Sequence, residues 1–269
     1  MGFPGANEAR ETADYVLLGA PLDVSTSFQP GTRFGPREVR HHAHTFDDYD
    51  RRTGKEFTDI GVHDAGDLDG WEDAAEYLEF LSGMVSDILD EESVPLLVGG
   101  EHTVSAAGVR ATDPDVFVCL DAHLDLREEY AGNELSHATV TRRTLDVVDE
   151  AIILGARTGS KEEWERADRD DVTVVPPADV PDWNPEFDGD VYLSVDIDAA
   201  DPGFAPGTGT MEPFGLTPRE IRRVVQAVAP RSTGFDVVEV NDRDDGQAAA
   251  LAGKLLREFV YSHAVRAAD

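Results

Sequence analysis

The feature that most constrains the fold is a series of short apolar runs that alternate with amphipathic helical patterns. Within each run the apolar residues are nearly continuous and do not alternate with polar ones. This is typical of strands buried on both faces, as in a parallel sheet between layers of helices. The runs are Tyr15–Gly19, Pro95–Val98, Val116–Leu120, Ala151–Leu154, Val191–Val195 and Phe235–Val238. We therefore expect an α/β fold with a mainly parallel sheet.

Helices are expected between these strands. The segment Thr217-Pro218-Arg219-Glu220 supplies an N-cap residue, a first-turn proline and a capping-box acid, and apolar residues at helical spacing follow it. Similar patterns cover residues 71–89 and 248–260, and the Gly/Pro-rich stretch 202–218 predicts a long loop. The 269 residues contain no internal repeat, low-complexity tract or linker, so we expect a single domain over residues 1–269.

The charge of the chain is extreme: 55 acidic residues against 23 basic ones give a formal net charge of -32. The acids are spread along patterned segments, which indicates a solvated acidic surface on a folded domain. At about 1 M salt the Debye length is only ~3 Å, so such a surface is screened, and we expect a halophilic protein. Nucleic acid is excluded as a partner, because binding to phosphates needs Lys and Arg clusters that this chain lacks.

Nothing in the sequence predicts a membrane or secreted protein. No apolar run approaches the ~20 residues that cross a bilayer, and the N-terminus has no secretory pattern. Cys119 is the only cysteine and lies in an apolar run, so we expect it to be buried and no disulfide to form. The expected location is the cytoplasm.

Potential metal ligands follow three of the predicted strands. His102 ends the segment Gly99-Gly100-Glu101-His102, in which the paired glycines allow a tight turn. Ligands also occur in Asp121-Ala122-His123-Leu124-Asp125 and in Asp196-Ile197-Asp198. Side chains at positions i, i+2 and i+4 of extended chain project to one side, and parallel sheets bind ligands at the carboxyl ends of their strands. We therefore expect all six side chains to meet.

Four carboxylates close together at buried strand ends are prohibitive unless they are protonated or bind cations. Two divalent cations satisfy this requirement, and oxygen-rich ligation with two imidazoles favours Mn²⁺ over Zn²⁺. Asp121 and Asp196 are candidates to bridge the two ions, between which a water would ionise near neutral pH and become a nucleophile. A single Asp-x-Asp after a strand is usually a cap, and a single His after Gly-Gly is usually a polar loop residue. Three such clusters after three strands favour the metal site.

These three segments resemble the signatures of the ureohydrolase family, the arginases and agmatinases. The resemblance extends to Pro202–Thr210 and to Phe28–Pro36, and so spans nearly the whole chain. It implies a three-layer αβα sandwich, release of urea from a guanidino substrate, two Mn²⁺ per subunit, and a homotrimer or homohexamer. Many relatives carry proline where Met211 and Asp242 stand here, which predicts an altered rim of the pocket.

The resemblance also implies roles for single residues. One ion is assigned to His102, Asp121, Asp125 and Asp196, and the other to Asp121, His123, Asp196 and Asp198. His137, in Ser136-His137-Ala138-Thr139, is similar to the family's proton shuttle, although many relatives have glycine at position 138. The alternative for His137 is a loop histidine that caps the following helix. Glu239 resembles the glutamate that binds the guanidinium, and its alternative is an ordinary ion-pair residue.

The choice of substrate depends on the loop Leu126–Leu135, which resembles the agmatinase version. Its acidic residues suit the terminal ammonium of agmatine, a small cationic substrate whose hydrolysis gives putrescine and urea. Asn133 and Thr210 are further candidates for substrate binding. Arginine and guanidinobutyrate stay open as substrates, because Asn133 also suits an arginase-like site and Arg127 suits a carboxylate.

Two other classes of protein need to be considered. A binuclear metallophosphoesterase is one, because Asp121-Ala122-His123 fits an Asp-x-His opening, but the Gly-Asp-x-x-Asp and Gly-Asn-His-Glu motifs that accompany it are absent. A catalytically silent relative with a binding role is the other, and the complete set of ligands argues against it.

Overall fold

A computed structural model describes residues 2–70 and 72–266 and shows a parallel sheet of eight strands in the order β4-β1-β5-β10-β9-β6-β7-β8. The six predicted strands are all present, which confirms the expected α/β class. The strands are β1 (Tyr15–Ala20), β4 (Val62–Asp67), β5 (Val94–Gly99), β6 (Val116–Leu120), β7 (Glu150–Leu154), β8 (Val172–Val175), β9 (Val191–Asp196) and β10 (Ser232–Val238). A separate antiparallel pair is formed by β2 (Tyr49–Asp50) and β3 (Lys55–Glu56).

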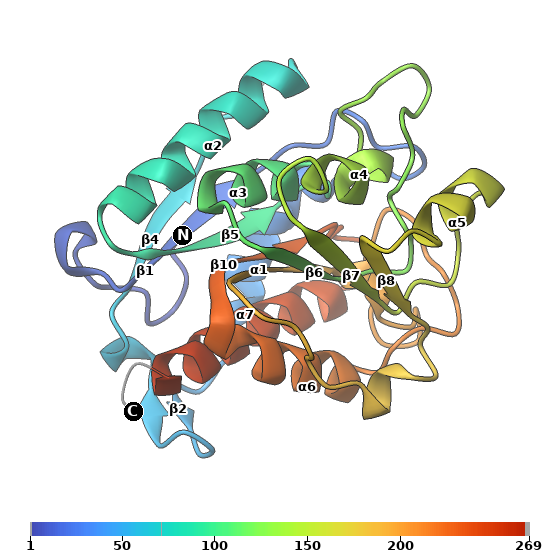
Figure 1. The fold of residues 1–269 in the computed structure, drawn as a ribbon. Helices are drawn as coiled ribbons and strands as arrows, with labels where there is room; N and C mark the ends of the chain where they lie inside the picture. The colour runs from blue at the N-terminus through green and yellow to red at the C-terminus, as the bar shows by residue number, and fades with distance from the viewer. Residues whose placement is uncertain (1, 71, 267–269) are drawn as a thin grey trace.

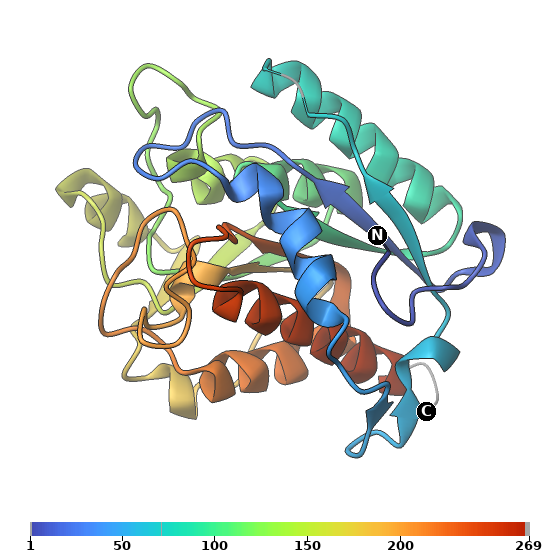
Figure 2. The ribbon, with the colours of Figure 1, turned by 180° about the vertical axis from the view of Figure 1, so that it is seen from behind.

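Helices cover both faces of the sheet and complete the three layers of an αβα sandwich (Figure 1). One face carries α2 (Ala74–Asp90), α3 (Val104–Thr112) and α4 (Val140–Thr144). The other carries α1 (Gly35–Ala43), α6 (Pro218–Val228) and α7 (Gln247–Arg266), seen in front in Figure 2, and α5 (Lys161–Ala167) lies near β8. The predicted helices at 71–89, 217–228 and 248–260 correspond to α2, α6 and α7, although Trp71 lies outside the described residues.

Local sequence explains where the predicted helices begin. Helix α6 starts at Pro218 with the expected capping box, in which Thr217 and Glu220 bond each other's backbone N–H groups. Helix α2 starts after Asp73, whose carboxylate accepts a hydrogen bond from the N–H of Glu76 at 3.0 Å. None of the described helices is long and apolar enough to span a bilayer.

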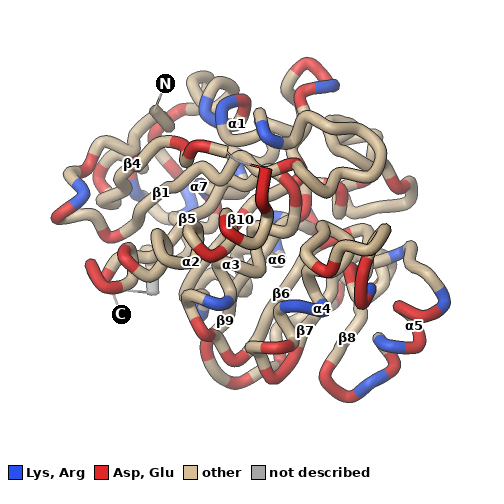
Figure 3. The backbone as a smooth tube through the Cα atoms, turned by 90° about the horizontal axis from the view of Figure 1, so that it is seen from above, with Lys and Arg blue, Asp and Glu red and all other residues tan. Residues whose placement is uncertain are grey.

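The two layers bury opposite sides of the same strands. Leu17 and Leu96 pack into the core that includes α6 and α7, whereas Val16 and Leu97 pack into the core that includes α2. This alternation follows from the two-residue period of a strand, and it makes the strands apolar along their whole length. Acidic residues are spread over all parts of the fold instead of forming one tract (Figure 3).

Four neighbouring strands position the candidate site. In the order of the sheet they are β5, β10, β9 and β6, so their carboxyl ends meet at one edge although they come from distant parts of the sequence. The turn after β5 needs glycine at position 100, because a Cβ there would lie 2.0 Å from the carbonyl oxygen of Leu22. Glu101 and His102 follow this turn and enter the edge of the sheet, just before α3.

Candidate metal centre and active site

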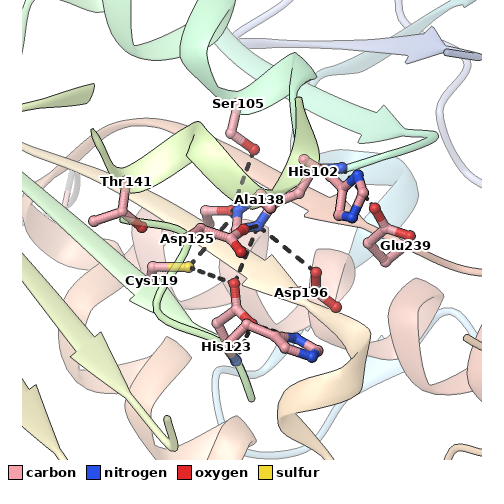
Figure 4. A network of polar contacts seen from close by, with 12 residues as sticks. His102, Ser105, Cys119, His123, Asp125, Ala138, Thr141, Asp196 and Glu239 are labelled. Carbon is pink, nitrogen blue, oxygen red and sulfur yellow. Dashed lines mark hydrogen bonds and ion pairs between the residues drawn. The ribbon is translucent and has the colours of Figure 1, made fainter. Parts of the chain in front are cut away.

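The predicted ligands converge at the carboxyl edge of the sheet. His102 follows β5, Asp121 follows β6, Asp196 ends β9 and Glu239 follows β10. Nδ1 of His102 lies 3.0 Å from Asp125 Oδ2, 3.1 Å from Asp121 Oδ2 and 3.7 Å from Asp196 Oδ2. Figure 4 shows His102, Asp125 and Asp196 directed toward one another.

A second group of ligands adjoins the first. Nδ1 of His123 lies 3.0 Å from Asp198 Oδ2 and 3.5 Å from Asp121 Oδ1, and potential ligand atoms of these three residues lie within 4.8 Å of one another. Asp121 is shared, with one carboxylate oxygen toward each histidine. The six predicted residues therefore lie together in two groups joined by Asp121.

The orientation of the His102 ring is fixed by Ser194 and Asp236 on its Nε2 side. Ser194 donates its hydroxyl proton to Asp236 Oδ1 at 2.6 Å, so its oxygen is an acceptor for Nε2–H of His102 at 3.2 Å. This leaves Nδ1 of His102 to face the carboxylates. Histidine ligands of metals are commonly oriented by such a bond to the other ring nitrogen.

The electrostatics of the site fit divalent cations. Burial and the charge of Asp121 raise the pKa of Asp125 to about 7, and burial and Asp198 raise the pKa of Asp196 well above its usual value. Burial opposes a charge on His123, but Asp198 and Asp121 raise its pKa far above the usual value. Without cations these groups therefore tend to hold extra protons. Cations in place of these protons would let every acid ionise, so the donor set suits two divalent ions.

Two functional positions have left-handed backbone. Asp125 has φ of 50° and Glu239 has φ of 61°, a conformation that non-glycine residues adopt rarely and at a cost. The fold holds both: Arg142 N–H donates to the carbonyl of Asp125 at 3.1 Å, and Glu239 N–H donates to the carbonyl of Gly100 at 2.8 Å. The strain directs both carboxylates into the site.

The cluster forms one end of a cavity of about 330 Å³. Glu239 lines it, and its Oε1 accepts the backbone N–H of His102 at 2.9 Å. Burial raises the pKa of Glu239 to about 8. The other oxygen, Oε2, faces Gly209, where a Cβ would lie 3.3 Å away, so the absence of a side chain at Gly209 keeps Oε2 accessible.

His137 lies at the side of the cavity, in the 3-10 helix η4 (His137–Thr139). Burial lowers its pKa to about 4, and His123 and His102 act in the same direction, so it is neutral at pH 7. The predicted alternative, a loop histidine that caps the following helix, does not describe its side chain, because Ser136 is the N-cap residue and the His137 ring contacts Ser25 and Ser27.

The remaining candidates differ in position. Thr210 lines the cavity. The side-chain amide of Asn133 exchanges hydrogen bonds of 3.0 Å with the backbone of Leu135, and Asn133 is not among the described residues that line the cavity. A role of Asn133 in substrate binding therefore stays a prediction.

The wall of the cavity contains Glu163, a residue that sequence reasoning missed. Glu163 is buried and lies 3.1 Å from the guanidinium of Arg127, which in turn lies 5.4 Å from the ring centre of Tyr130. In the sequence Ser160-x-x-Glu163 is a helix-capping pattern, and Glu163 does cap α5. Because the capping role explains Glu163 in the sequence, the sequence gives no signal that Glu163 also lines the cavity.

Comparison with known proteins agrees with the geometry. The sequence profile of the Arginase family matches residues 13–261. The chain belongs to the arginase family. The agmatinase of Bacillus anthracis is 35% identical over 96% of this chain and 94% of its own length. The N(1)-aminopropylagmatine ureohydrolase of Thermococcus kodakarensis is 34% identical over 91% of this chain and 89% of its own length. The agmatine ureohydrolase structure of Thermoplasma volcanium has a TM-score of 0.91 at 33% identity, covering 97% of this chain and 94% of that one.

Membership of the arginase family decides between the classes considered from the sequence. The chain is a hydrolase of the ureohydrolase type, which acts on guanidino or amidine groups. The family profile and the similar proteins named above support a hydrolase of this family over a metallophosphoesterase and over a silent binding protein.

Proposed function

We propose that this arginase-family hydrolase cleaves agmatine to putrescine and urea, with two Mn²⁺ ions per subunit. The observation that carries the proposal is the placement of Glu239 in the same cavity as the two groups of metal ligands. Similar proteins that are named agmatinase or agmatine ureohydrolase support the choice of substrate.

His102, Asp121, Asp125 and Asp196 are the proposed ligands of one ion, and Asp121, His123, Asp196 and Asp198 those of the other. Bound there, the two cations would supply a water that is nucleophilic near neutral pH and Lewis-acid stabilisation of developing negative charge. The four carboxylates balance the charge of two divalent ions. The pKa of Glu239, about 8 in the empty site, would fall beside two cations, which leaves Glu239 as an additional negative group for the substrate.

Glu239 is proposed to orient the guanidinium. Because its Oε1 accepts the N–H of His102, Oε2 is the oxygen that binds the N–H groups of the substrate. A guanidinium held in this way presents its central carbon toward the ligand cluster. His137, which is neutral at pH 7, is proposed to accept a proton at its ring and pass it to the departing amine, so that putrescine leaves as an ammonium ion.

The cavity wall favours a substrate without a carboxylate. Arg127 is the only Lys or Arg among the described residues that line the cavity, and its charge is balanced by Glu163 at 3.1 Å. The carboxylate of arginine or guanidinobutyrate would therefore lack a free cationic partner. An unpaired charged group costs about 1–3 kcal/mol or more, which corresponds to a preference for agmatine of about 10-fold to 100-fold or more.

The test measures urea release by Mn²⁺-loaded protein in molar KCl with agmatine, arginine, guanidinobutyrate and N(1)-aminopropylagmatine, and phosphate release from a generic phosphate ester. We expect agmatine to have the highest kcat/KM. A higher kcat/KM for arginine or guanidinobutyrate would refute the assignment of substrate, and release of phosphate without urea would refute the assignment of reaction.

Glu239→Gln tests the role of the guanidinium-binding carboxylate. We expect kcat/KM for agmatine to fall about 10²-fold to 10³-fold, because a neutral amide loses the charge-assisted hydrogen bond. Glu165→Gln is the matched control, since Glu165 is an exposed glutamate of α5 that pairs with Lys161. Equal activity of the two variants would contradict the proposed role of Glu239.

A further inference from the structure

His137 is held by a hydrogen-bonded chain that leads away from the cavity. Ser25 Oγ lies 3.2 Å from Nδ1 of the His137 ring and also accepts the backbone N–H of His137 at 3.0 Å. Ser27 Oγ lies 3.3 Å from the other ring nitrogen, Nε2. Ser25 thus contacts His137 twice, although the two residues are 112 positions apart in the sequence.

Glu101 determines which way the hydroxyl of Ser25 points. This glutamate is fully buried, and its Oε2 accepts the backbone N–H of Ser25 at 2.7 Å. Its Oε1 accepts the hydroxyl of Ser25 at 2.8 Å and that of Thr103 at 2.7 Å. A serine hydroxyl has one proton to donate. Because that proton is donated to Glu101, Ser25 Oγ is only an acceptor toward Nδ1 of His137.

We propose that Glu101, acting through Ser25, fixes the neutral tautomer of His137 with its proton on Nδ1 and its lone pair on Nε2. In the other tautomer the lone pairs of Nδ1 and Ser25 Oγ would face each other at 3.2 Å, which is unfavourable. The fixed tautomer makes Nε2 the basic nitrogen, and Ser27 is the neighbour that can donate to it.

Ser136 is the one competing donor to Nδ1 among the described residues, and it is the weaker partner. Its Oγ lies 3.4 Å from Nδ1 and accepts the N–H of Ala138 as the helix cap, whereas Ser25 lies closer. The same arrangement occurs at His102, where Asp236 takes the proton of Ser194 and Ser194 accepts from the imidazole. Two imidazoles of the site are therefore oriented by a carboxylate through a serine.

Glu101 and Ser25 are thus positioning residues, and the inference rests on the proposed function only in assigning a proton-transfer role to His137. The tautomer itself is measurable without turnover. Nitrogen-15 NMR distinguishes protonated from unprotonated ring nitrogens, and the protein would be loaded with Mg²⁺, because Mn²⁺ is paramagnetic and broadens nearby signals. The His137 signals are identified by their loss in His137→Asn.

In the wild type we expect Nδ1–H to exceed Nε2–H by about tenfold or more, the ratio that one hydrogen bond of ordinary strength produces. Ser25→Ala removes the acceptor, so Nε2–H should become the larger population. Ser27→Ala is the matched control on the other nitrogen and should leave Nδ1–H dominant. A dominant Nε2–H in the wild type, or an unchanged ratio in Ser25→Ala, would overturn the proposal.

Glu101→Gln provides a second test that preserves shape. The backbone N–H of Ser25 can only donate, so the amide oxygen of Gln must take the place of Oε2 and its NH₂ the place of Oε1. The NH₂ then donates to Ser25, the hydroxyl of Ser25 turns to donate to Nδ1, and the tautomer should reverse. A purely structural role of Glu101 predicts no reversal. Absence of urea release with a normal Nδ1–H signal would count against the proposed function alone.

Discussion

Binding of metal ions to this site should release more than one proton, because the pKa values of four predicted ligands are raised in the empty site. The perturbation is removal of divalent ions with a chelator, followed by reloading with Mn²⁺. Metal ligands must be deprotonated, so every proton that the empty cluster holds is displaced when the ions bind. The proton inventory of the empty cluster therefore sets the pH dependence of the affinity.

In the empty site the pKa values of four of the six predicted ligands are raised. Burial opposes a charge on His102, but Cys119 and the hydrogen bonds to Asp121 and Asp125 raise its pKa well above the usual value. The pKa of His123 is also raised, chiefly by Asp198, and burial raises that of Asp196. His123 therefore holds a proton at pH 7, Asp125 with a pKa of about 7 is half protonated, and the raised pKa values of His102 and Asp196 favour further protons on the empty site. Reloading should displace more than one proton per subunit.

Calorimetric titration of the empty protein with Mn²⁺ in molar KCl, in buffers with different ionisation enthalpies, measures this number. The logarithm of the overall binding constant should rise by more than one unit per pH unit near pH 7. Asp125→Asn should lower the proton count by about one half. Release of one proton or fewer would show that the carboxylates and imidazoles do not form the coupled cluster described here.

The same protonation equilibria predict that the melting temperatures of the empty and the metal-loaded protein depend on pH in opposite directions. In the empty protein the pKa values of His102, His123, Asp125 and Asp196 are all raised, so the folded state binds more protons than the unfolded state. The stability that they contribute is present below the unfolded pKa values and is lost as pH rises through the folded ones. The melting temperature of the empty protein should fall between pH 6 and pH 8, whereas with Mn²⁺ present it should rise, as ion binding tightens.

Three further predictions concern other parts of the molecule. His137→Asn should lower kcat for urea release about 10²-fold to 10⁴-fold with little change in KM. Because burial lowers the pKa of His137 to about 4, ionisation of this residue should not lower the wild-type rate above about pH 5. Arg157→Lys should lower the free energy of unfolding by about 1.5–3 kcal/mol in urea titrations and should weaken Mn²⁺ binding, because the Arg157 guanidinium donates to the carbonyls of Asp198 at 2.8 Å and Glu212 at 2.7 Å. Unchanged Mn²⁺ affinity would refute the link between Arg157 and the segment that carries Asp198. Dilution from molar to about 0.1 M KCl should lower the melting temperature by roughly 10 °C or more, because the repulsion within a net charge of -32 is then screened less; an unchanged value would reject the halophilic interpretation.

The central strands were predictable because they are covered on both faces, and the edge strands were not. β4 lies at one edge of the sheet beside β1 and reads Val-His-Asp-Ala-Gly-Asp, so its sequence is rich in polar residues and resembles a loop. β8 lies at the other edge beside β7 and is four residues long. Hydrophobic patterning detects burial and not strand pairing, so strands at the border of the sheet leave little signal.

Helices α1 and α5 were missed for a related reason. Helix α1 begins with Gly35-Pro36 and ends among histidines, and its first turn follows a 3-10 turn instead of a clear N-cap. Helix α5 spans seven residues, of which only Glu163 is buried, so it has no apolar stripe to detect. Elements that contribute little to the core are difficult to predict from the core pattern.

The metal ligands were predictable because each lies at a strand end, where position along the strand determines direction. The residues that orient them were not predictable in this way. Ser25 and Glu101 meet through a loop that crosses the carboxyl edge of the sheet, and Asp236 reaches His102 through Ser194 of the neighbouring strand. Such contacts depend on the order of strands in the sheet, which the order in the sequence does not reveal.

The position of Arg157 has a consequence for substrate choice. Its guanidinium bonds the carbonyl of Asp198 at the ligand cluster and that of Glu212 in the rim loop, so the cluster and the rim are held by one side chain. Met211 directly precedes the anchored Glu212, and Thr210 before it lines the cavity. A change of backbone at Met211 is therefore transmitted both to the cavity lining and to the segment that carries Asp198. Substitutions in this rim should therefore change KM together with Mn²⁺ affinity.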